Sequence, residues 1–113
     1  MKDNLRPFHL AFPVRDLEET RNWYTDILEC RVGRESDTWI DFNMFGHQIV
    51  AHLSENIDSI SENNVDGYNI PIRHFGIILK PMEWKSLKEK FLSKDIEFII
   101  KPNTRVGRWL TIA

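Results

Sequence analysis

The chain has 113 residues, close to the usual size of one domain and long enough to bury a core without disulfide bonds. Hydrophobic residues make up 42% of the sequence and charged residues 28%, which excludes a disordered chain, and a net charge of −2 without any basic run argues against a nucleic-acid partner. Cys30 is the sole cysteine, so an intramolecular disulfide is excluded and the reducing cytoplasm is the expected location. No apolar run is long enough for a membrane span or a signal peptide, so we expect no membrane partner.

The first predicted element is a strand over residues 7–14. Apolar residues alternate there with small or polar ones, so that Phe8, Leu10 and Phe12 share one face. His9 and Ala11 therefore share the opposite face.

A helix is predicted next, from Asp16 to about Glu29. Asp16 is a capping residue, and Glu19 three positions later completes the form of a capping box. The apolar stripe that follows contains Leu17, Thr20, Tyr24, Ile27 and Leu28.

Three short strands are predicted after the helix, over residues 30–35, 38–43 and 47–53. Plausible turns separate them at Ser36-Asp37 and at Phe45-Gly46. Residues 55–71 are polar and rich in Asn, Ser and Asp, and we expect them to form an exposed linker.

The opening pattern then returns. A strand is predicted over residues 72–80, with His74 on one face and Phe75 on the other. Pro81 begins a second helix whose apolar stripe contains Trp84, Leu87 and Phe91 and which ends near Lys94 and Asp95. A further strand over 96–100, a loop and one last apolar run complete the pattern.

Strand, helix and strand thus recur with a shift of 65 residues, and His74 takes the place of His9. This spacing indicates a duplicated βαβββ unit within a single domain that spans residues 1–113. The first module covers about 6–54, the linker about 55–71 and the second module about 72–113. We expect the second module to be truncated, because the chain stops at Ala113 before the equivalent of the last strand.

Three stretches, HLAFPVRDLEETRNWYTDILECRVG, GHQIVAHL and RHFGIILKPMEWKSLKEKF, resemble the vicinal oxygen chelate superfamily of glyoxalases, bleomycin resistance proteins and extradiol dioxygenases. The resemblance implies an α+β fold in which paired βαβββ modules form a cupped mixed sheet. It also implies a divalent metal ion held by side chains from the first and last strands of each module.

Carried over to this sequence, the first-strand ligand matches His9 and its counterpart in the second module matches His74. His47 and His52 compete for a third position on the last strand of the first module. They are five residues apart and therefore point to opposite faces. We favour His52, because Ile49 and its alternate neighbours belong on the helix face. The carboxylate ligand of the family would lie on the strand that is expected to be missing.

Trp39, Asp41 and Gln48 are predicted to line the cup and to contact the substrate. Imidazole ligands suit iron, manganese, nickel, cobalt and zinc, so the sequence does not select the metal. The leading hypothesis is a metal-dependent enzyme of the glyoxalase or extradiol dioxygenase type that binds a small molecule through vicinal oxygens. A metal-free ligand-binding protein of the bleomycin-resistance type and an inactive shortened member are the alternatives. An exposed sheet edge predicts a homodimer.

Overall fold

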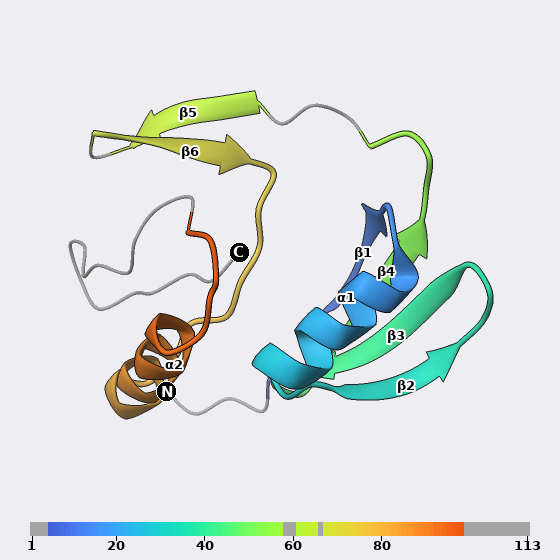
Figure 1. Ribbon diagram of the computed structural model, residues 1–113, viewed down its shortest axis with the longest axis horizontal. Coiled ribbons are helices and arrows are strands. Elements are labelled where there is room, and N and C mark those ends of the chain that lie inside the picture. The colour runs from blue at the N-terminus through green and yellow to red at the C-terminus, as the bar shows by residue number, and fades with distance from the viewer. Residues whose placement is uncertain (1–4, 58–60, 66, 99–113) are drawn as a thin grey trace. The chain divides into compact units, whose positions relative to one another are not determined.

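The computed structural model describes residues 5–57, 61–65 and 67–98 of the chain (Figure 1). They belong to two compact units, Met1–Asp58 and Ser59–Ala113. No helix in the described part of the chain is both long enough and apolar enough to cross a membrane.

The first unit is a βαβββ module with one four-stranded sheet. Its elements are β1 (His9–Val14), α1 (Leu17–Asn22), a π-helical turn η1 (Trp23–Ile27), β2 (Arg31–Glu35), β3 (Trp39–Met44) and β4 (His47–Leu53). The strands lie in the order β1-β4-β3-β2. This confirms the element order and, within one or two residues, the strand bounds that the sequence predicts.

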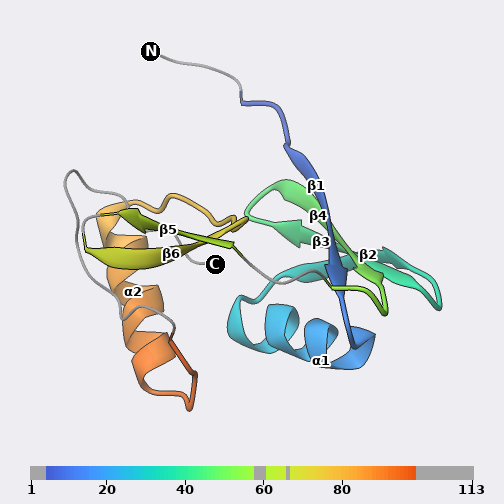
Figure 2. The same cartoon turned by 90° about the horizontal axis from the view of Figure 1, so that it is seen from above.

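The central feature of the sheet is the parallel pairing of β1 with β4, whose register sets Ala11 against Val50. A parallel pair needs a crossover connection, and α1 with β2 and β3 provides it. The other two strand pairs are antiparallel. Figure 2 shows α1 lying along one face of the sheet, and the face away from α1 is called the distal face below.

The helix begins where a side-chain cap favours it and ends in a wider turn. Asp16 Oδ1 accepts a hydrogen bond from the Glu19 backbone N–H at 2.9 Å, as the predicted cap requires. The last turn is wider than an α-helix, and the Cys30 N–H donates to the Tyr24 carbonyl at 2.9 Å. Glu29 then leaves the helix at a positive φ of 56°. The π-helical turn is not predicted by the sequence.

The core lies between α1 and the sheet. Ile40 and Phe42 are each 1% exposed, and Ala51 is fully buried. The Tyr24 ring lies between two aromatic rings, with centroid distances of 6.0 Å to Phe12 and 5.1 Å to Phe42. Aromatic pairs at such distances add to the stability gained from burial. The helix-facing side of β1, β3 and β4 is therefore the one that the alternation predicts.

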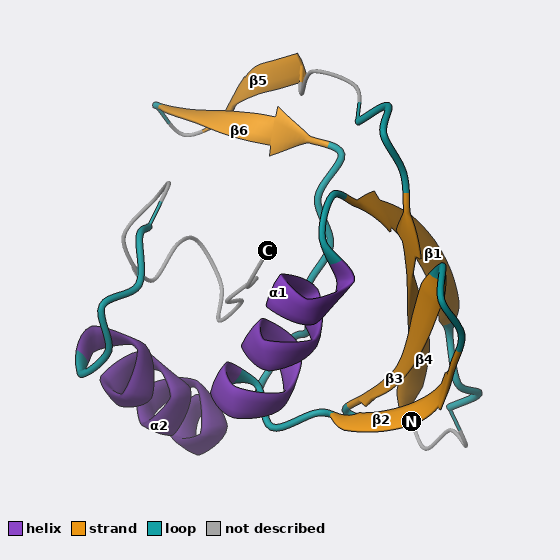
Figure 3. Cartoon of the chain, turned by 45° about the vertical axis from the view of Figure 1, so that its right-hand side comes forward, coloured by secondary structure: helices purple, strands orange, loops and turns teal. Residues whose placement is uncertain are grey.

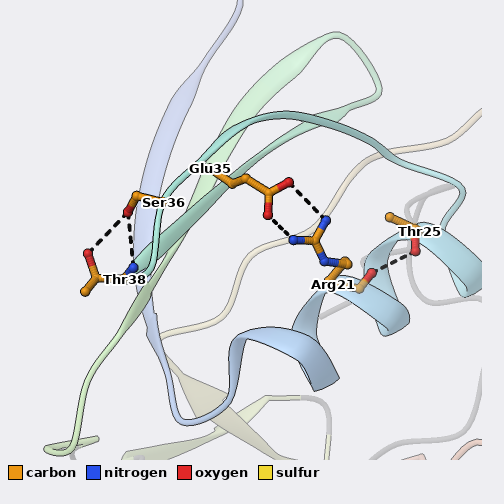
Figure 4. Close-up of polar contacts among 5 residues, drawn as sticks. All are labelled: Arg21, Thr25, Glu35, Ser36 and Thr38. Carbon is orange, nitrogen blue, oxygen red and sulfur yellow. Dashed lines mark hydrogen bonds and ion pairs between the residues drawn. The ribbon is translucent and has the colours of Figure 1, made fainter.

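An ion pair links the helix to the end of β2. The Arg21 guanidinium donates from both terminal nitrogens to the two carboxylate oxygens of Glu35 (Figure 4). The hydrogen bond from Arg21 lowers the pKa of the Glu35 carboxyl below its usual value. Both side chains are solvent-exposed, so water screens this pair and it contributes little to folding.

The β3–β4 hairpin is closed by Phe45 and Gly46, which have φ angles of 51° and 88°. Two successive residues with positive φ are the mark of a tight two-residue hairpin turn. The turn predicted at this dipeptide is confirmed. Glycine adopts this backbone without strain, whereas phenylalanine does so at a cost.

The second unit contains a hairpin and one helix. Its elements are β5 (Ser61–Val65), β6 (Tyr68–Ile72) and α2 (Pro81–Leu92). Phe91 is the most buried residue of α2, while Trp84 and Leu87 are half-buried, so the predicted apolar stripe is confirmed.

Two predictions for this unit are wrong. Residues 55–71 contain the β5–β6 hairpin, although the sequence predicts a linker without strands. Residues 73–80, for which the sequence predicts a strand, run as a loop (Figure 3). Residues 96–98 of the next predicted strand are not in a strand either. Its end and the final apolar run lie outside the described residues.

Burial of two ionisable groups predicts a loss of stability at alkaline pH. Burial raises the pKa of the Cys30 thiol to about 11, and burial together with the neighbouring thiolate raises the pKa of the Tyr24 hydroxyl to about 12. Both groups are neutral in the fold and ionise more easily in the unfolded chain. The fold is therefore favoured over the unfolded chain as long as both groups are protonated in both states. This contribution to the free energy of unfolding is complete below pH 9, the ordinary pKa of the thiol, and is lost as the pH rises through 11 to 12.

We therefore expect the free energy of unfolding, measured in urea by circular dichroism, to fall by of order 2 kcal/mol between pH 9 and pH 11. Tyr24→Phe removes one of the two ionisable groups and should flatten the upper part of this dependence. An identical decline in Tyr24→Phe, Cys30→Ala and the wild type would contradict the assignment.

Candidate functional site

The distal face carries most of the residues that the sequence selects as functional. Strand register places nine side chains there: His9, Ala11 and Pro13 from β1, Trp39, Asp41 and Asn43 from β3, and Gln48, Val50 and His52 from β4. Paired residues on adjacent strands point to the same side of a sheet. The face therefore has polar groups at both ends, and its middle row contains Asp41 beside Ala11 and Val50.

Three polar side chains form a continuous chain of hydrogen bonds at one end of this face. His9 Nδ1 lies 2.9 Å from Gln48 Oε1, because the β1–β4 register sets these two residues directly against each other. Gln48 Nε2 in turn donates to Asp41 Oδ2 at 3.0 Å. The three residues come from β1, β4 and β3, so the network crosses three neighbouring strands.

Asp41 is the buried end of this network. It is 9% exposed, and Gly33 of β2 lies next to its carboxylate. A Cβ at Gly33 would lie 3.4 Å from Asp41 Oδ2. The sequence predicts that Asp41 contacts substrate, but in the structure its carboxylate is engaged with Gln48.

His52 lies at the other end of the distal face. It is paired with Trp39 on one side and Pro13 on the other, four residues beyond Gln48. Four residues of strand span roughly 13 Å. The structure therefore places His9 and His52 on the same face, as predicted, but does not bring them together. Arg34 accompanies Trp39, with its guanidinium carbon 5.5 Å from the ring centroid.

His47 lies at the start of β4, where strand alternation directs it away from the distal face. Its Nδ1 accepts a hydrogen bond from the Phe8 backbone N–H at 2.8 Å. The side chain thus extends the pairing of β1 with β4 by one residue. The preference for His52 over His47 as a distal-face residue agrees with this register.

His74 belongs to the second unit and is exposed. Phe75 and Ile77 are half-buried and Leu79 is 6% exposed, while the residues between them are exposed. The alternation predicted for this segment is therefore present even though the segment is not a strand. Whether His74 acts together with His9 stays a prediction.

The described residues contain no group of three or more His, Cys, Asp and Glu side chains that could hold a metal ion. Within the first unit, His9 offers one imidazole on the distal face and Asp41 is engaged with Gln48. This end of the distal face thus offers one side chain, His9, as a metal ligand.

A separate surface hollow of about 280 Å³ lies near the turn that follows the helix. It is lined by Leu28, Glu29, Cys30, Arg31, Asn43 and Phe45. None of these residues is among the predicted site residues. The raised pKa of the Cys30 thiol keeps this group protonated and unreactive at neutral pH.

Sequence reasoning selects His9, Gln48 and Asp41 separately but misses the connection between them. Part of this connection was visible in the sequence, because alternation along each strand places both Asp41 and Gln48 on the predicted cup face. The register of β1 on β4 was the missing information. This register brings His9 next to Gln48 and so joins the three residues in one hydrogen-bond network.

Comparison with known proteins identifies one family. The model of the Glyoxalase/Bleomycin resistance protein/Dioxygenase superfamily matches residues 6–108. A glyoxalase/bleomycin resistance protein/dioxygenase from Alicyclobacillus acidocaldarius is 33% identical, with a TM-score of 0.64 over 82% of this chain. The chain covers 66% of that structure's length. No curated protein sequence matches the chain significantly.

More distant structures share the fold. The fosfomycin resistance protein FosX from Listeria monocytogenes, in its monoclinic form at pH 5.75, is 18% identical with a TM-score of 0.65, covering 94% of this chain and 76% of its own. A mutant of that protein, complexed with Mn(II) and 1S,2S-dihydroxypropylphosphonic acid, is also 18% identical, with a TM-score of 0.53 over 82% of this chain and 65% of its own. At this identity the likeness supports the fold alone.

Proposed function

The chain belongs to the Glyoxalase/Bleomycin resistance protein/Dioxygenase superfamily, and we propose that it is a metal-dependent enzyme that acts on a small oxygenated molecule. His9 and His74 are the proposed metal ligands. The observation that carries the proposal is the position of His9 on the distal face, in the first strand, with its ring held by Gln48.

The distal face also supports the proposed mode of substrate binding. A bound divalent metal would supply Lewis-acid activation to two neighbouring oxygens of the substrate. The residues of this chain then have to bind and orient the rest of the molecule. Trp39 is half-buried on the distal face beside His52, and we propose that these two side chains contact the substrate at a distance from His9.

Mn(II) is a suitable probe metal, because a mutant of the structurally similar FosX was crystallised with it. We expect one equivalent of Mn(II) to bind the purified full chain, measured by isothermal titration calorimetry after treatment with a chelator. His9→Ala and His74→Ala should each weaken binding by more than roughly 100-fold, since loss of a direct ligand should exceed the effect of losing an outer-shell group.

His52→Ala is the matched control. It removes an exposed imidazole from the same sheet face, four residues along β4 from Gln48, which is the strand partner of His9. This variant should bind Mn(II) as the wild type does. Equal loss in all three variants would contradict the ligand assignment. Absence of binding in the folded wild type would instead favour a metal-free binding protein.

A homodimer is part of the proposal. Within the described four-stranded sheet, β1 and β2 each have one edge without a strand partner, and such edges favour pairing with another chain. Sedimentation equilibrium at micromolar concentration should give twice the mass of the chain. A monodisperse monomer would contradict this part of the proposal.

A further inference from the structure

The hydrogen-bond network on the distal face determines more than the position of His9. It has a direction, because its members differ in whether they donate or accept. The His9 Nδ1 to Gln48 Oε1 distance is 2.9 Å, and the Gln48 Nε2 to Asp41 Oδ2 distance is 3.0 Å. The order of donors and acceptors along these two contacts fixes the location of the His9 proton.

The buried end of the network sets this order. A carboxylate only accepts hydrogen bonds, so the group of Gln48 that faces Asp41 has to be the NH₂. The carboxamide is planar, and its carbonyl oxygen therefore faces His9. A carbonyl oxygen also only accepts, so His9 Nδ1 has to carry a hydrogen. In a neutral imidazole the lone pair is then on Nε2.

We infer that Asp41 and Gln48 are positioning residues that hold neutral His9 in its Nδ1–H tautomer and leave the lone pair on Nε2. The tautomer follows from the network alone. Its use, with Nε2 as the nitrogen that binds a metal, rests on the proposed function. Gln48 and Asp41 thus act through His9, whereas the sequence predicts that they contact substrate directly.

Burial makes this control effective. Asp41 is 9% exposed, so water competes little for the carboxylate oxygen that Gln48 contacts. An exposed carboxylate would exchange such a partner with water and would leave the amide free to rotate. The fixed end of the network is therefore the one that is protected from solvent.

His47 provides an internal control in the same module. Its Nδ1 accepts a hydrogen bond from the Phe8 backbone N–H, so a neutral His47 has to carry its proton on Nε2. The two histidines, which flank the same β1–β4 pair, are thus expected in opposite tautomers. One spectrum can report both.

The test uses the metal-free full chain with ¹⁵N-labelled histidine. Long-range ¹H–¹⁵N correlation spectra at neutral pH distinguish a protonated ring nitrogen from an unprotonated one. We expect the proton on Nδ1 in His9 and on Nε2 in His47. A His9 proton on Nε2 in the wild type would overturn the inference.

Two variants test the role of each positioning residue. Gln48→Leu removes the acceptor with little change in size, and Asp41→Asn keeps the shape but allows an NH₂ to face the Gln48 oxygen, so that the amide can rotate. Each should increase the fraction of the Nε2–H tautomer of His9 and leave the His47 signals unchanged. The unchanged His47 signals show that the β1–β4 pair is still formed. If Gln48→Leu does not fold, the near-isosteric Asp41→Asn still decides the question.

Mn(II) binding separates this inference from the proposed function. In Gln48→Leu the Mn(II) affinity should fall by about 10- to 100-fold, as for other outer-shell partners of a ligating histidine. An unchanged His9 tautomer in both variants overturns the positioning role. The predicted tautomer in a wild-type chain that binds no Mn(II) supports the positioning role and overturns the proposed function.

Discussion

The parallel pairing of β1 with β4 is the constraint on which the first unit depends. Residues 15–46 separate the end of β1 from the start of β4, and only a crossover connection can join the two strands in parallel. The helix that makes this crossover covers one sheet face and leaves the other face to the polar residues. The same register sets His9 against Gln48 and places His52 about four residues away. Core and candidate site are thus two consequences of one strand pairing.

Much of this unit was predictable because its residues agree at each level. Alternation in β1 and β4, the cap at Asp16 and the turn at Gly46 all favour the structure that forms. A face assignment needs only the period of two residues along a strand, and this period is visible in sequence. The predicted face of each candidate residue on β1, β3 and β4 was therefore correct even where its partner was unknown.

The remainder depended on information that one sequence does not contain. Pairing partners of β1 and β4 are distant in sequence, so the link from His9 through Gln48 to Asp41 could not be found from local pattern. The β5–β6 hairpin is a different case. An Asp-Gly dipeptide is a strong hairpin signal, but the polar residues on both sides of it favoured a linker in the sequence. In the structure these flanking residues pair with each other as two strands, despite their low strand propensity. The π-helical turn at Tyr24 has no distinct sequence signature.

Strand register, the buried Asp41 carboxylate and the Gln48 amide together position one ring nitrogen of His9. The most direct test is electron spin-echo envelope modulation of the Mn(II)-loaded full chain, which counts the imidazole nitrogens bound to the metal. We predict two such nitrogens in the wild type and one in any Mn(II) complex that His9→Ala or His74→Ala still forms at high metal concentration. An unchanged count in His9→Ala, or no bound imidazole in the wild type, would contradict the account.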